Sequence, residues 1–476
     1  MHRIPVWVCL FLPVAAPAAS GEPAGQPIEH FDSDPGWESY RSHLVPNPIP
    51  VVRQDFGHRA GHRARGAKAG EIGGWIQRSI TPAYYAKSIS ERTLDHEMKA
   101  SGKFAVAKNK GGSGSLFGWF NSQSRGWRAP NSLAMRIDGN GDNYWLLVEY
   151  GTRHWLTACQ GTFEGQYQTT KTKPFAADGT SHQWTLHYDP HANSDRGLIT
   201  FVLDDQKFSL PLEAGHKEDG AVFNRFGLFN QQITGDGMEV YFDDLVIDGQ
   251  AQDFDRDPGW DARSNNVTRE ERAIRPMHDF GYSATQHCGG QKGEIGGIVW
   301  RDEKPAFYGD RVGPFSLEDV LFASGKIAFT GAGSDSGVYL GWFDSASKKN
   351  KKVPEHQEPQ KNMLAIKLEG PSRIGHYFVP GYATNSGKGE IKSEGPIIRP
   401  DGQVHCWSLR YSPDDAHGKG RIILEFDDVV QTLDLPAGAR QAGATFDRFG
   451  LFNMQSGGHY VSVYLDDVSY SKRRKQ

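Results

Sequence analysis

The chain has few cysteines, and this narrows the class of protein. Only four occur among 476 residues, and Cys9 lies in the N-terminal apolar stretch. The other three, Cys159, Cys288 and Cys406, are an odd number and cannot form a disulfide framework, although Cys288 and Cys406 could pair with each other. No Cys-x-x-Cys motif or His/Cys cluster indicates zinc.

Long apolar runs are also missing after the N-terminus. Residues 1–20 combine a short basic start, an apolar run and a small-residue end, which is typical of an export signal. A membrane-spanning helix needs about 20 apolar residues, and this run is shorter and contains prolines. We therefore expect a secreted protein, extracellular or periplasmic, that is cleaved near Ala19 and has no membrane span.

The chain lacks a strong charge of either sign, with a formal net charge of −4. A nucleic-acid-binding domain would be strongly basic, so nucleic acid is not an expected partner. The oligomeric state is not readable from the sequence.

What the chain does have is an internal repeat with an offset of 223 residues. The heptapeptide FDSDPGW at Phe31–Trp37 returns as FDRDPGW at Phe254–Trp260, and the phrases GEIGG, GWF and FGLFN recur at the same offset. A repeat of this length predicts two homologous domains. We expect a signal peptide (1–20), a flexible leader (21–30), domain 1 (31–248), a linker (249–253), domain 2 (254–471) and a basic tail (472–476).

Within each half the apolar residues alternate with polar ones, and long segments of helical periodicity are missing. Leu133, Met135 and Ile137 alternate with Ala134, Arg136 and Asp138, and a Gly-Asn-Gly-Asp turn then leads into Tyr144–Tyr150. This pattern predicts a β-hairpin. About a dozen such strands in each half predict a two-sheet β-sandwich.

The end of each half carries a recognisable pattern. His182-x-Trp184 leads to Tyr188-x-Pro190, followed by a strand with an acidic turn, a short Leu-rich strand and a last strand Tyr-Phe-Asp-Asp-Leu. This pattern resembles the concanavalin A-like (lectin/glucanase, laminin-G-like) jelly roll. The resemblance implies an all-β protein of two tandem jelly-roll domains, but a shared fold does not assign a function. The E-x-D-x-x-E pattern of glucanases of this fold is absent, which counts against a simple retaining glucanase.

Four repeated acidic residues are candidate metal ligands. Glu71 and Glu294 stand inside the two GEIGG phrases, and Asp243 and Asp466 lie on the last strands. Oxygen-rich acidic sites suit calcium, and related jelly rolls often hold a calcium ion there. The alternatives are a catalytic carboxylate, a structural calcium ion and a purely structural acid.

The matched His182 and His405 precede a tryptophan at a strand entry, where a structural role is the more common one. Arg225 and Arg448 precede FGLFN, and we expect each to pair with a nearby aspartate such as Asp447.

A site used in one half should appear as a difference between the copies. The first half has seven tryptophans and the second has four, and Trp127, Trp145 and Trp155 have no tryptophan counterpart. Alternation places Trp145 and Glu149 on the same strand face. Aromatic rings beside a carboxylate and His154 could form a sugar platform with acid/base groups, and core packing is the alternative. The candidate catalytic residues are Glu149, His154 and Glu71; the candidate substrate-binding residues are Trp145, Trp127, Trp155, Arg136, Arg125 and Arg128.

Basic residues occupy equivalent loops in both halves. Arg125 and Arg128 follow GWF in the first half, and Lys348, Lys349, Lys351 and Lys352 follow it in the second. A further basic loop, from His58 to Lys68, precedes the first GEIGG phrase. This favours an anionic partner such as a uronic or sulfated polysaccharide, with binding that weakens as salt increases.

The sequence thus predicts a secreted protein that binds an extracellular, anionic polysaccharide, chiefly through domain 1. The first alternative is a glycoside hydrolase or polysaccharide lyase with its active site in domain 1. The second is a laminin-G-like module that binds proteins.

Overall fold

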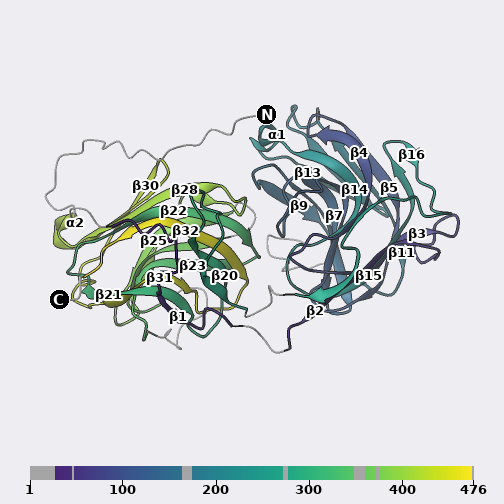
Figure 1. Cartoon of the computed structure of the whole chain (residues 1–476). Helices are drawn as coiled ribbons and strands as arrows, with labels where there is room; N and C mark the ends of the chain where they lie inside the picture. The colour runs from purple at the N-terminus through teal and green to yellow at the C-terminus, as the bar shows by residue number, and fades with distance from the viewer. Residues whose placement is uncertain are drawn as a thin grey trace.

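The computed structural model describes residues 27–44, 48–162, 174–271, 277–347, 360–370 and 375–473. Their regular structure is almost entirely β, with two short helices, α1 (His216–Asp219) and α2 (Asp415–Gly418). This confirms the all-β class. The chain forms two lobes side by side (Figure 1). The expected signal peptide, most of the leader, Lys348–Lys352 and the end of the basic tail lie outside the described residues.

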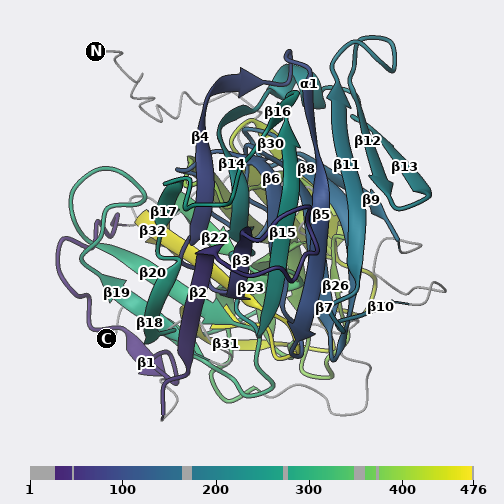
Figure 2. The same ribbon diagram turned by 90° about the vertical axis from the view of Figure 1, so that its right-hand side faces the viewer.

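Lobe 1 consists of two antiparallel sheets, whose strands lie side by side in Figure 2. The β6 sheet contains, in order, β10 (Phe175–Ala176), β8 (Asn143–Gly151), β7 (Ser132–Asn140), β6 (Gly114–Phe120), β14 (Val222–Asn230), β4 (Tyr84–Thr93) and β17 (Asp261–Arg263), with β9 (Thr157–Gly161) beside β8. The β5 sheet contains β13 (Gln206–Pro211), β12 (Leu198–Leu203), β11 (Ser181–Asp189), β5 (Met98–Asn109), β15 (Gly237–Ile247), β3 (Glu71–Gln77), β2 (Val51–Arg59) and β18 (Asn266–Glu270), with β16 (Gln250–Ala251) beside β15.

Lobe 2 repeats this arrangement. The β23 sheet contains β1 (Glu38–Tyr40), β21 (Phe307–Ser316), β31 (Thr445–Asn453), β23 (Ser336–Phe343), β24 (Met363–Gly370), β25 (His376–Ala383) and β26 (Gly389–Ile391), with β27 (Ile397–Ile398) beside β25. The β22 sheet contains β19 (Asp279–Ser283), β20 (Glu294–Trp300), β32 (Tyr460–Tyr470), β22 (Leu321–Ala332), β28 (Val404–Ser412), β29 (Arg421–Phe426) and β30 (Val429–Asp434).

The alternation of apolar side chains explains both cores. Leu133, Met135 and Ile137 on β7 are fully buried between the sheets of lobe 1, as the hairpin prediction requires. The hairpin is confirmed, because β7 pairs with β8 across residues 141–142. Across the same core Phe117 stacks on Phe242 with ring centroids 3.8 Å apart.

The two copies of the heptapeptide pack in the lobes opposite to those predicted. Phe31 and Trp37 belong to the core of lobe 2, whereas Phe254 and Trp260 belong to the core of lobe 1. The strands that follow the two heptapeptides pack in the same lobes, because β1 pairs with β21 of lobe 2 and β17 pairs with β4 of lobe 1. The expectation that these heptapeptides open domains 1 and 2, respectively, is therefore wrong. We call residues 27–44 the clasp segment and residues 254–271 the exchange segment.

The two segments make the same contacts. Trp260 stacks on Tyr85, and Trp37 stacks on Tyr308, each with centroids 5.8 Å apart. The hydroxyl of Tyr85 donates to Asp257 (2.6 Å), and that of Tyr308 donates to Asp34 (3.0 Å). One common packing mode therefore serves both lobes.

The first glycines of the two GEIGG phrases are required by this packing. Gly70 and Gly293 have positive φ angles of 109° and 120°, and a Cβ at either position would collide with a backbone carbonyl, of Phe254 or Phe31 respectively. Only glycine combines this φ with so close an approach. The repeated phrase thus marks the place where the heptapeptide docks.

The chain leaves lobe 1 later than predicted. Within the expected linker, Gln250–Ala251 forms β16 and folds back on β15. The chain continues through β18, where the Glu271 N–H donates to the carbonyl of Pro50 (2.9 Å). Pro50, just before β2, and Glu271, just after β18, therefore lie side by side.

Candidate functional site

An aromatic row lies on the outer face of the β6 sheet in lobe 1. Tyr84, Phe120 and Phe229 come from β4, β6 and β14, and alternation turns them away from the core residues beside them. Tyr84 lies 5.4 Å from Phe120, and Phe120 stacks on Phe229 at 4.3 Å, between ring centroids. The three side chains are 7%, 4% and 3% exposed, so the row is covered and does not face solvent.

The loop of residues 121–131 folds over the row and leaves a narrow hollow. The space between the rings and the loop has a volume of about 10 Å³, which is about enough for one water molecule. Gln232 fixes the loop by accepting from the Gly126 N–H (2.9 Å) and donating to the Ser124 carbonyl (3.3 Å). The polar residues that line the hollow include Asn121, Ser122 and Gln232.

The rim of the hollow comes partly from the exchange segment. Arg225 donates to Asp261 from two nitrogens, at 2.9 and 2.8 Å, and the Tyr84 hydroxyl donates to the same carboxylate at 3.3 Å. Arg263 donates to the carbonyl of Ser122 at 3.1 Å. Burial raises the pKa of Tyr84, and the Asp261 carboxylate adds to this rise.

Lobe 2 has the same row with a different cover. Phe343 lies 5.2 Å from Phe307 and 4.4 Å from Phe452. Tyr40 of β1 occupies the position of Arg263 and stacks on Phe307 at 5.4 Å, with its planes 21° apart. An aromatic ring thus replaces a cation over the row of lobe 2.

The predicted catalytic residue Glu149 is part of a buried ionic network. It is 2% exposed and accepts from Arg136 at 3.0 Å, while Arg136 also donates to Asp138 and Arg78 contacts Asp138. Burial acts to lower the pKa of Arg136, but Asp138 and Glu149 outweigh it and raise that pKa. Glu149 is therefore not presented to a substrate in this structure, and a catalytic role for it finds no support in the geometry.

The three tryptophans that have no counterpart in the second half are also buried. Trp127, Trp145 and Trp155 are 7%, 9% and 2% exposed. Trp127 and Trp155 form a cluster with Ile233, and Gly126 leaves room for the Trp155 ring against the backbone. These rings form no open sugar platform, and core packing, the alternative, is what the structure shows.

The predicted arginines are divided between this cluster and the surface. Arg128 and Arg136 lie over the Trp127 ring, at 4.7 and 4.9 Å from its centroid. Arg125 is exposed. The structure thus brings Trp127, Trp155, Arg128, Arg136 and Glu149 together, but beneath the surface.

His154 is the predicted catalytic residue that faces solvent. Its side chain is 42% exposed, and Nδ1 lies 2.6 Å from a carboxylate oxygen of Asp219. Burial acts to raise the pKa of Asp219, but hydrogen bonds from Thr152 and His154 outweigh it and lower that pKa. A histidine oriented in this way has the geometry of an acid/base group.

The four candidate metal ligands form one pair in each lobe, and both pairs hold loops. Glu71 accepts from the Ala64 N–H (2.8 Å), and Glu294 accepts from the N–H groups of His287 and Cys288, both at 2.9 Å. Burial, with smaller contributions from neighbouring carboxylates, raises the pKa of both Asp243 and Asp466 to about 6.

These residues do not fit a calcium ion. Calcium takes six to eight oxygen ligands. Within the described ranges no three His, Cys, Asp or Glu side chains lie together in a way that could hold a metal. Glu71 has one buried oxygen without a hydrogen-bond partner, as has Asp243, whereas hydrogen bonds occupy both oxygens of Glu294.

Contacts in the structure decide three smaller expectations. Cys288 is a buried free thiol, so it does not pair with Cys406, and burial raises its pKa. His182 and His405 bond to the hairpin-turn residues Asp204 and Asp427, each at 2.7 Å, which confirms a structural role. The expected aspartate partner is also found for Arg448, which lies 3.0 Å from Asp447.

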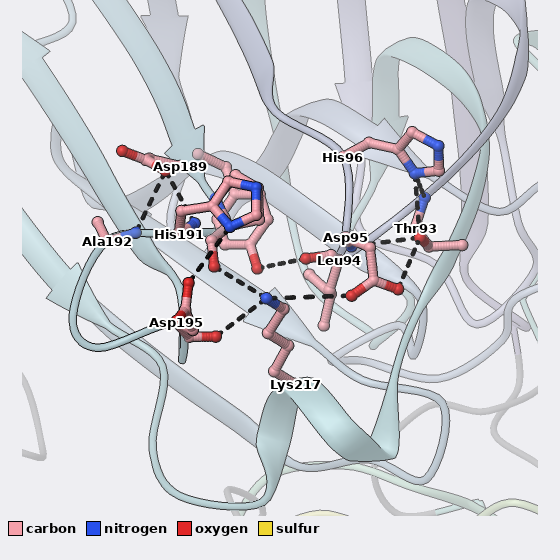
Figure 3. Close-up of polar contacts among 11 residues, drawn as sticks. Thr93, Leu94, Asp95, His96, Asp189, His191, Ala192, Asp195 and Lys217 are labelled. Atoms are coloured by element: carbon pink, nitrogen blue, oxygen red, sulfur yellow. Dashed lines mark hydrogen bonds and ion pairs between the residues drawn. The ribbon is translucent and has the colours of Figure 1, made fainter.

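A polar cluster at one end of lobe 1 is structural (Figure 3). The Lys217 ammonium donates to the carbonyls of Pro190 and Asp195, both at 2.9 Å, and lies 4.0 Å from Asp95. In lobe 2, Arg440 donates to the carbonyls of Pro413 and Gly418 and pairs with Glu318. A cation fixes the same loop in both lobes, which indicates that the contact stabilises the fold.

Sequence reasoning missed the residues that form the hollow. Phe120 and Phe229 belong to the repeated phrases GWF and FGLFN, and Tyr84 belongs to the repeated Pro-Ala-Tyr-Tyr/Pro-Ala-Phe-Tyr pair. Alternation could have placed them opposite the core residues.

Comparisons with known proteins give only weak likenesses. No family model matches the chain, and no curated protein matches it. Among solved structures, domains LG4-5 of the mouse laminin α1 chain are 11% identical, cover 91% of this chain and 99% of their own, and have a TM-score of 0.24. The carbohydrate recognition domain of Emp47p (11% identity, 40% and 89%) and an alginate lyase from Pseudomonas aeruginosa (10%, 44% and 96%) both have a TM-score of 0.26. Among the described residues, no helix is long and apolar enough to cross a membrane.

Proposed function

We propose that this protein is exported and recognises an extracellular polysaccharide through lobe 1. The observation that carries the proposal is the exposed basic loop between β2 and β3.

The polysaccharide is anionic. The loop between β2 and β3 exposes His62, Arg63, Arg65 and Lys68. Two hydrogen bonds fix this loop, from the Ala64 N–H to Glu71 and from the Ala67 N–H to Asp244, both 2.8 Å long. Lys68 contacts Asp255 at 3.0 Å and Arg63 contacts Glu239 at 3.6 Å, whereas among the described residues no carboxylate lies within ion-pair distance of Arg65. A fixed cation attracts a polyanion without first having to be ordered, and salt weakens that attraction.

Affinity electrophoresis in gels that contain neutral or acidic polysaccharides tests this function. We expect retardation by at least one acidic polymer, weaker retardation as salt increases, and partial loss in Arg65→Gln, which removes one exposed cation of the loop between β2 and β3. Arg196→Gln, an exposed arginine elsewhere on lobe 1, is the matched control. Unchanged mobility on every polysaccharide would contradict the proposal.

A second function, glycan hydrolysis or elimination in lobe 1, is favoured by the exposed His154 and its carboxylate partner Asp219. Release of oligosaccharides from the same panel, lost in His154→Gln with unchanged thermal stability, would support it. Binding without any product would favour recognition alone.

A further inference from the structure

We propose that the outer face of the β5 sheet in lobe 1 binds one sugar ring of an acidic polysaccharide, and that this ring stacks on Trp75. The inference rests on the proposed function, because it places a sugar-binding surface beside the basic loop between β2 and β3. It names the residues that contact the uncharged part of the ligand.

Trp75 differs from the other tryptophans in its exposure. It lies on β3 and is half-buried, whereas every other tryptophan in the described ranges is buried. Its neighbours Ile72 and Ile76 are fully buried in the core, so alternation turns Trp75 to the outer face of the sheet. A ligand that covers this ring removes apolar surface from water, which favours binding.

A glycine on the neighbouring strand gives the Trp75 ring its place. Gly237 begins β15, and a Cβ at this position would come within 2.4 Å of the Trp75 ring. The ring therefore rests against the backbone of β15. A side chain that is already held in one position loses little conformational entropy when a ligand stacks on it.

Two carboxylates flank Trp75. Asp55 of β2 and Glu239 of β15 lie directly opposite it in the two strand pairs. The three side chains therefore share the outer face, with Cβ atoms about 4.5–5.5 Å apart. The side chains of Asp55 and Glu239 are 36% and 26% exposed. Carboxylates accept hydrogen bonds from sugar hydroxyls, and an aromatic ring suits the apolar face of a sugar.

Both carboxylates are held by neighbouring side chains. Arg59 donates to the carboxylate of Asp55 and, at 2.8 Å, to its backbone carbonyl. Arg63 lies 3.6 Å from Glu239, and the hydroxyl of Tyr241 donates to the same carboxylate. The polar groups around Trp75 are thus ordered before a ligand binds.

The charges decide where the acidic group of the ligand lies. Each carboxylate beside Trp75 already has an arginine partner, so an anionic substituent gains little there. Arg63 also lies over the Tyr241 ring, 5.3 Å from its centroid, and so connects this face to the basic loop. We therefore expect the stacked sugar to present hydroxyls to the carboxylates, while an acidic group of the polymer faces Arg65 in the loop.

The basic loop lies within reach of the same polymer chain. The loop is bonded to Glu71 through the Ala64 N–H, and Glu71 precedes Trp75 by four residues on β3. Four residues of a strand span about 13 Å. A few linked sugar residues can therefore contact Trp75 and the loop together, and two contacts on one chain raise its affinity.

Lobe 2 provides an internal comparison. At the repeat offset, the counterparts of Trp75 and Gly237 are Ile298 and Tyr460. Both pack in a cluster with Trp300 and with Ile80 of lobe 1. The contact between the lobes thus occupies this face of lobe 2, and we expect one such sugar-binding surface per chain.

Affinity electrophoresis and tryptophan fluorescence of the full chain test the inference. The polymers are polygalacturonate, dextran sulfate and uncharged dextran. The proteins are the wild type, Trp75→Ala, Trp75→Phe and, as a control, Tyr40→Ala, because Tyr40 is an aromatic residue of lobe 2 that is 46% exposed.

For the acidic polymer that retards the wild type most strongly, we expect at least tenfold weaker binding by Trp75→Ala and no change in Tyr40→Ala. The loss should be smaller in Trp75→Phe, which keeps an aromatic ring. The same polymer should protect the fluorescence of the wild type from quenching by acrylamide, and this protection should be lost in Trp75→Phe. The fluorescence of the wild type gives an answer even where Trp75→Ala is unstable.

Unchanged affinity in Trp75→Ala, or binding to the wild type without protection from acrylamide, overturns the role of Trp75 while the proposed function stands. Equal retardation by dextran and dextran sulfate contradicts the acidic group facing Arg65. A wild type that no acidic polymer retards contradicts both proposals.

Discussion

Each lobe buries an arginine that pairs with two carboxylates, and in lobe 2 these carboxylates, Asp335 and Glu369, are 58% and 34% exposed. Lobe 1 combines Arg136 with Asp138 and Glu149, all at most 5% exposed. Lobe 2 combines Arg301, 1% exposed, with Asp335 and Glu369. A buried charge is costly unless it is paired, so removal of one partner destabilises more than removal of both.

Glu149→Gln should therefore lower stability more than it lowers any activity. Loss of the carboxylate leaves Arg136 with less compensation in a buried position, at a cost of about 3–5 kcal/mol. The measurement is the thermal unfolding midpoint of lobe 1. Glu97→Gln, an exposed pair with His187, should change stability by less than about 1 kcal/mol. An unchanged midpoint in Glu149→Gln would show that the ion pair contributes little.

The raised pKa values of Asp243 and Asp466, both about 6, predict that the folded state gains stability on mild acidification. Between this pKa and the ordinary value near 3.8, the folded protein holds a proton that the unfolded chain has released, so stability falls as pH rises. Each aspartate should contribute about 1 kcal/mol between about pH 5 and pH 7.5.

The variants Asp243→Asn and Asp466→Asn isolate this effect. Each should be more stable than the wild type near pH 7.5, and the advantage should shrink toward pH 5. Asp244→Asn is the control, because burial acts to raise the pKa of Asp244 but the Ala67 N–H and Lys103 outweigh it and lower that pKa. A pH-independent difference between Asp243→Asn and the wild type would exclude the titration.

At the level of elements, the exchange of the two heptapeptides has a direct test. Trp37→Ala should loosen lobe 2, although the residue directly precedes lobe 1 in the sequence, because its ring packs on Tyr308 and Tyr470. Trp260→Ala should loosen lobe 1. Each truncation of a buried tryptophan should cost about 3–5 kcal/mol.

Hydrogen exchange read by mass spectrometry distinguishes the two lobes. Amides of β21 and β31 should exchange faster in Trp37→Ala, and amides of β4 and β14 should exchange faster in Trp260→Ala. The opposite pattern would restore the predicted boundaries at residues 31 and 254.

The sequence allowed the strands to be predicted, but not their partners across the repeat. The alternation of Leu133, Met135 and Ile137 and the acidic turns gave the hairpins correctly, because side-chain period and turn chemistry are local properties. Which lobe holds Phe31 and which holds Phe254 is not local. Both copies carry the same Phe, Asp and Trp, so either copy satisfies either site.

The structure does not place the predicted site residues on an open surface, and the reason is related. Alternation correctly placed Trp145 and Glu149 on one face of β8, but it gives no information about what covers that face. Trp127, Trp155 and the loop of residues 121–131 cover that face. Their position depends on contacts between residues distant in sequence, such as the hydrogen bond from the Gly126 N–H to Gln232.

At the scale of the whole molecule, the exchange of the heptapeptides means that the two lobes differ in which parts of the chain they need. Lobe 1 is complete within residues 48–271, because the exchange segment follows its other strands directly. Lobe 2 needs the clasp segment, which supplies Phe31, Trp37 and Glu38 from the opposite end of the chain.

A fragment of residues 48–271 should therefore fold alone, whereas one of residues 277–473 should not fold stably until a peptide of residues 27–44 is added. The far-ultraviolet spectrum and a cooperative thermal transition measure this. The same peptide with Trp37→Ala is the control and should fail. Stable folding of residues 277–473 without any peptide would show that the clasp segment is dispensable.

The packing of the clasp segment also imposes an order on synthesis. Phe31 and Trp37 are made first, but Tyr308, on which Trp37 stacks, is made only after all of lobe 1. During that interval the nascent chain already contains Tyr85, which in the finished structure contacts the same Asp and Trp of the second copy. We therefore expect Phe31–Trp37 and Phe254–Trp260 to compete for lobe 1 while the chain is being made.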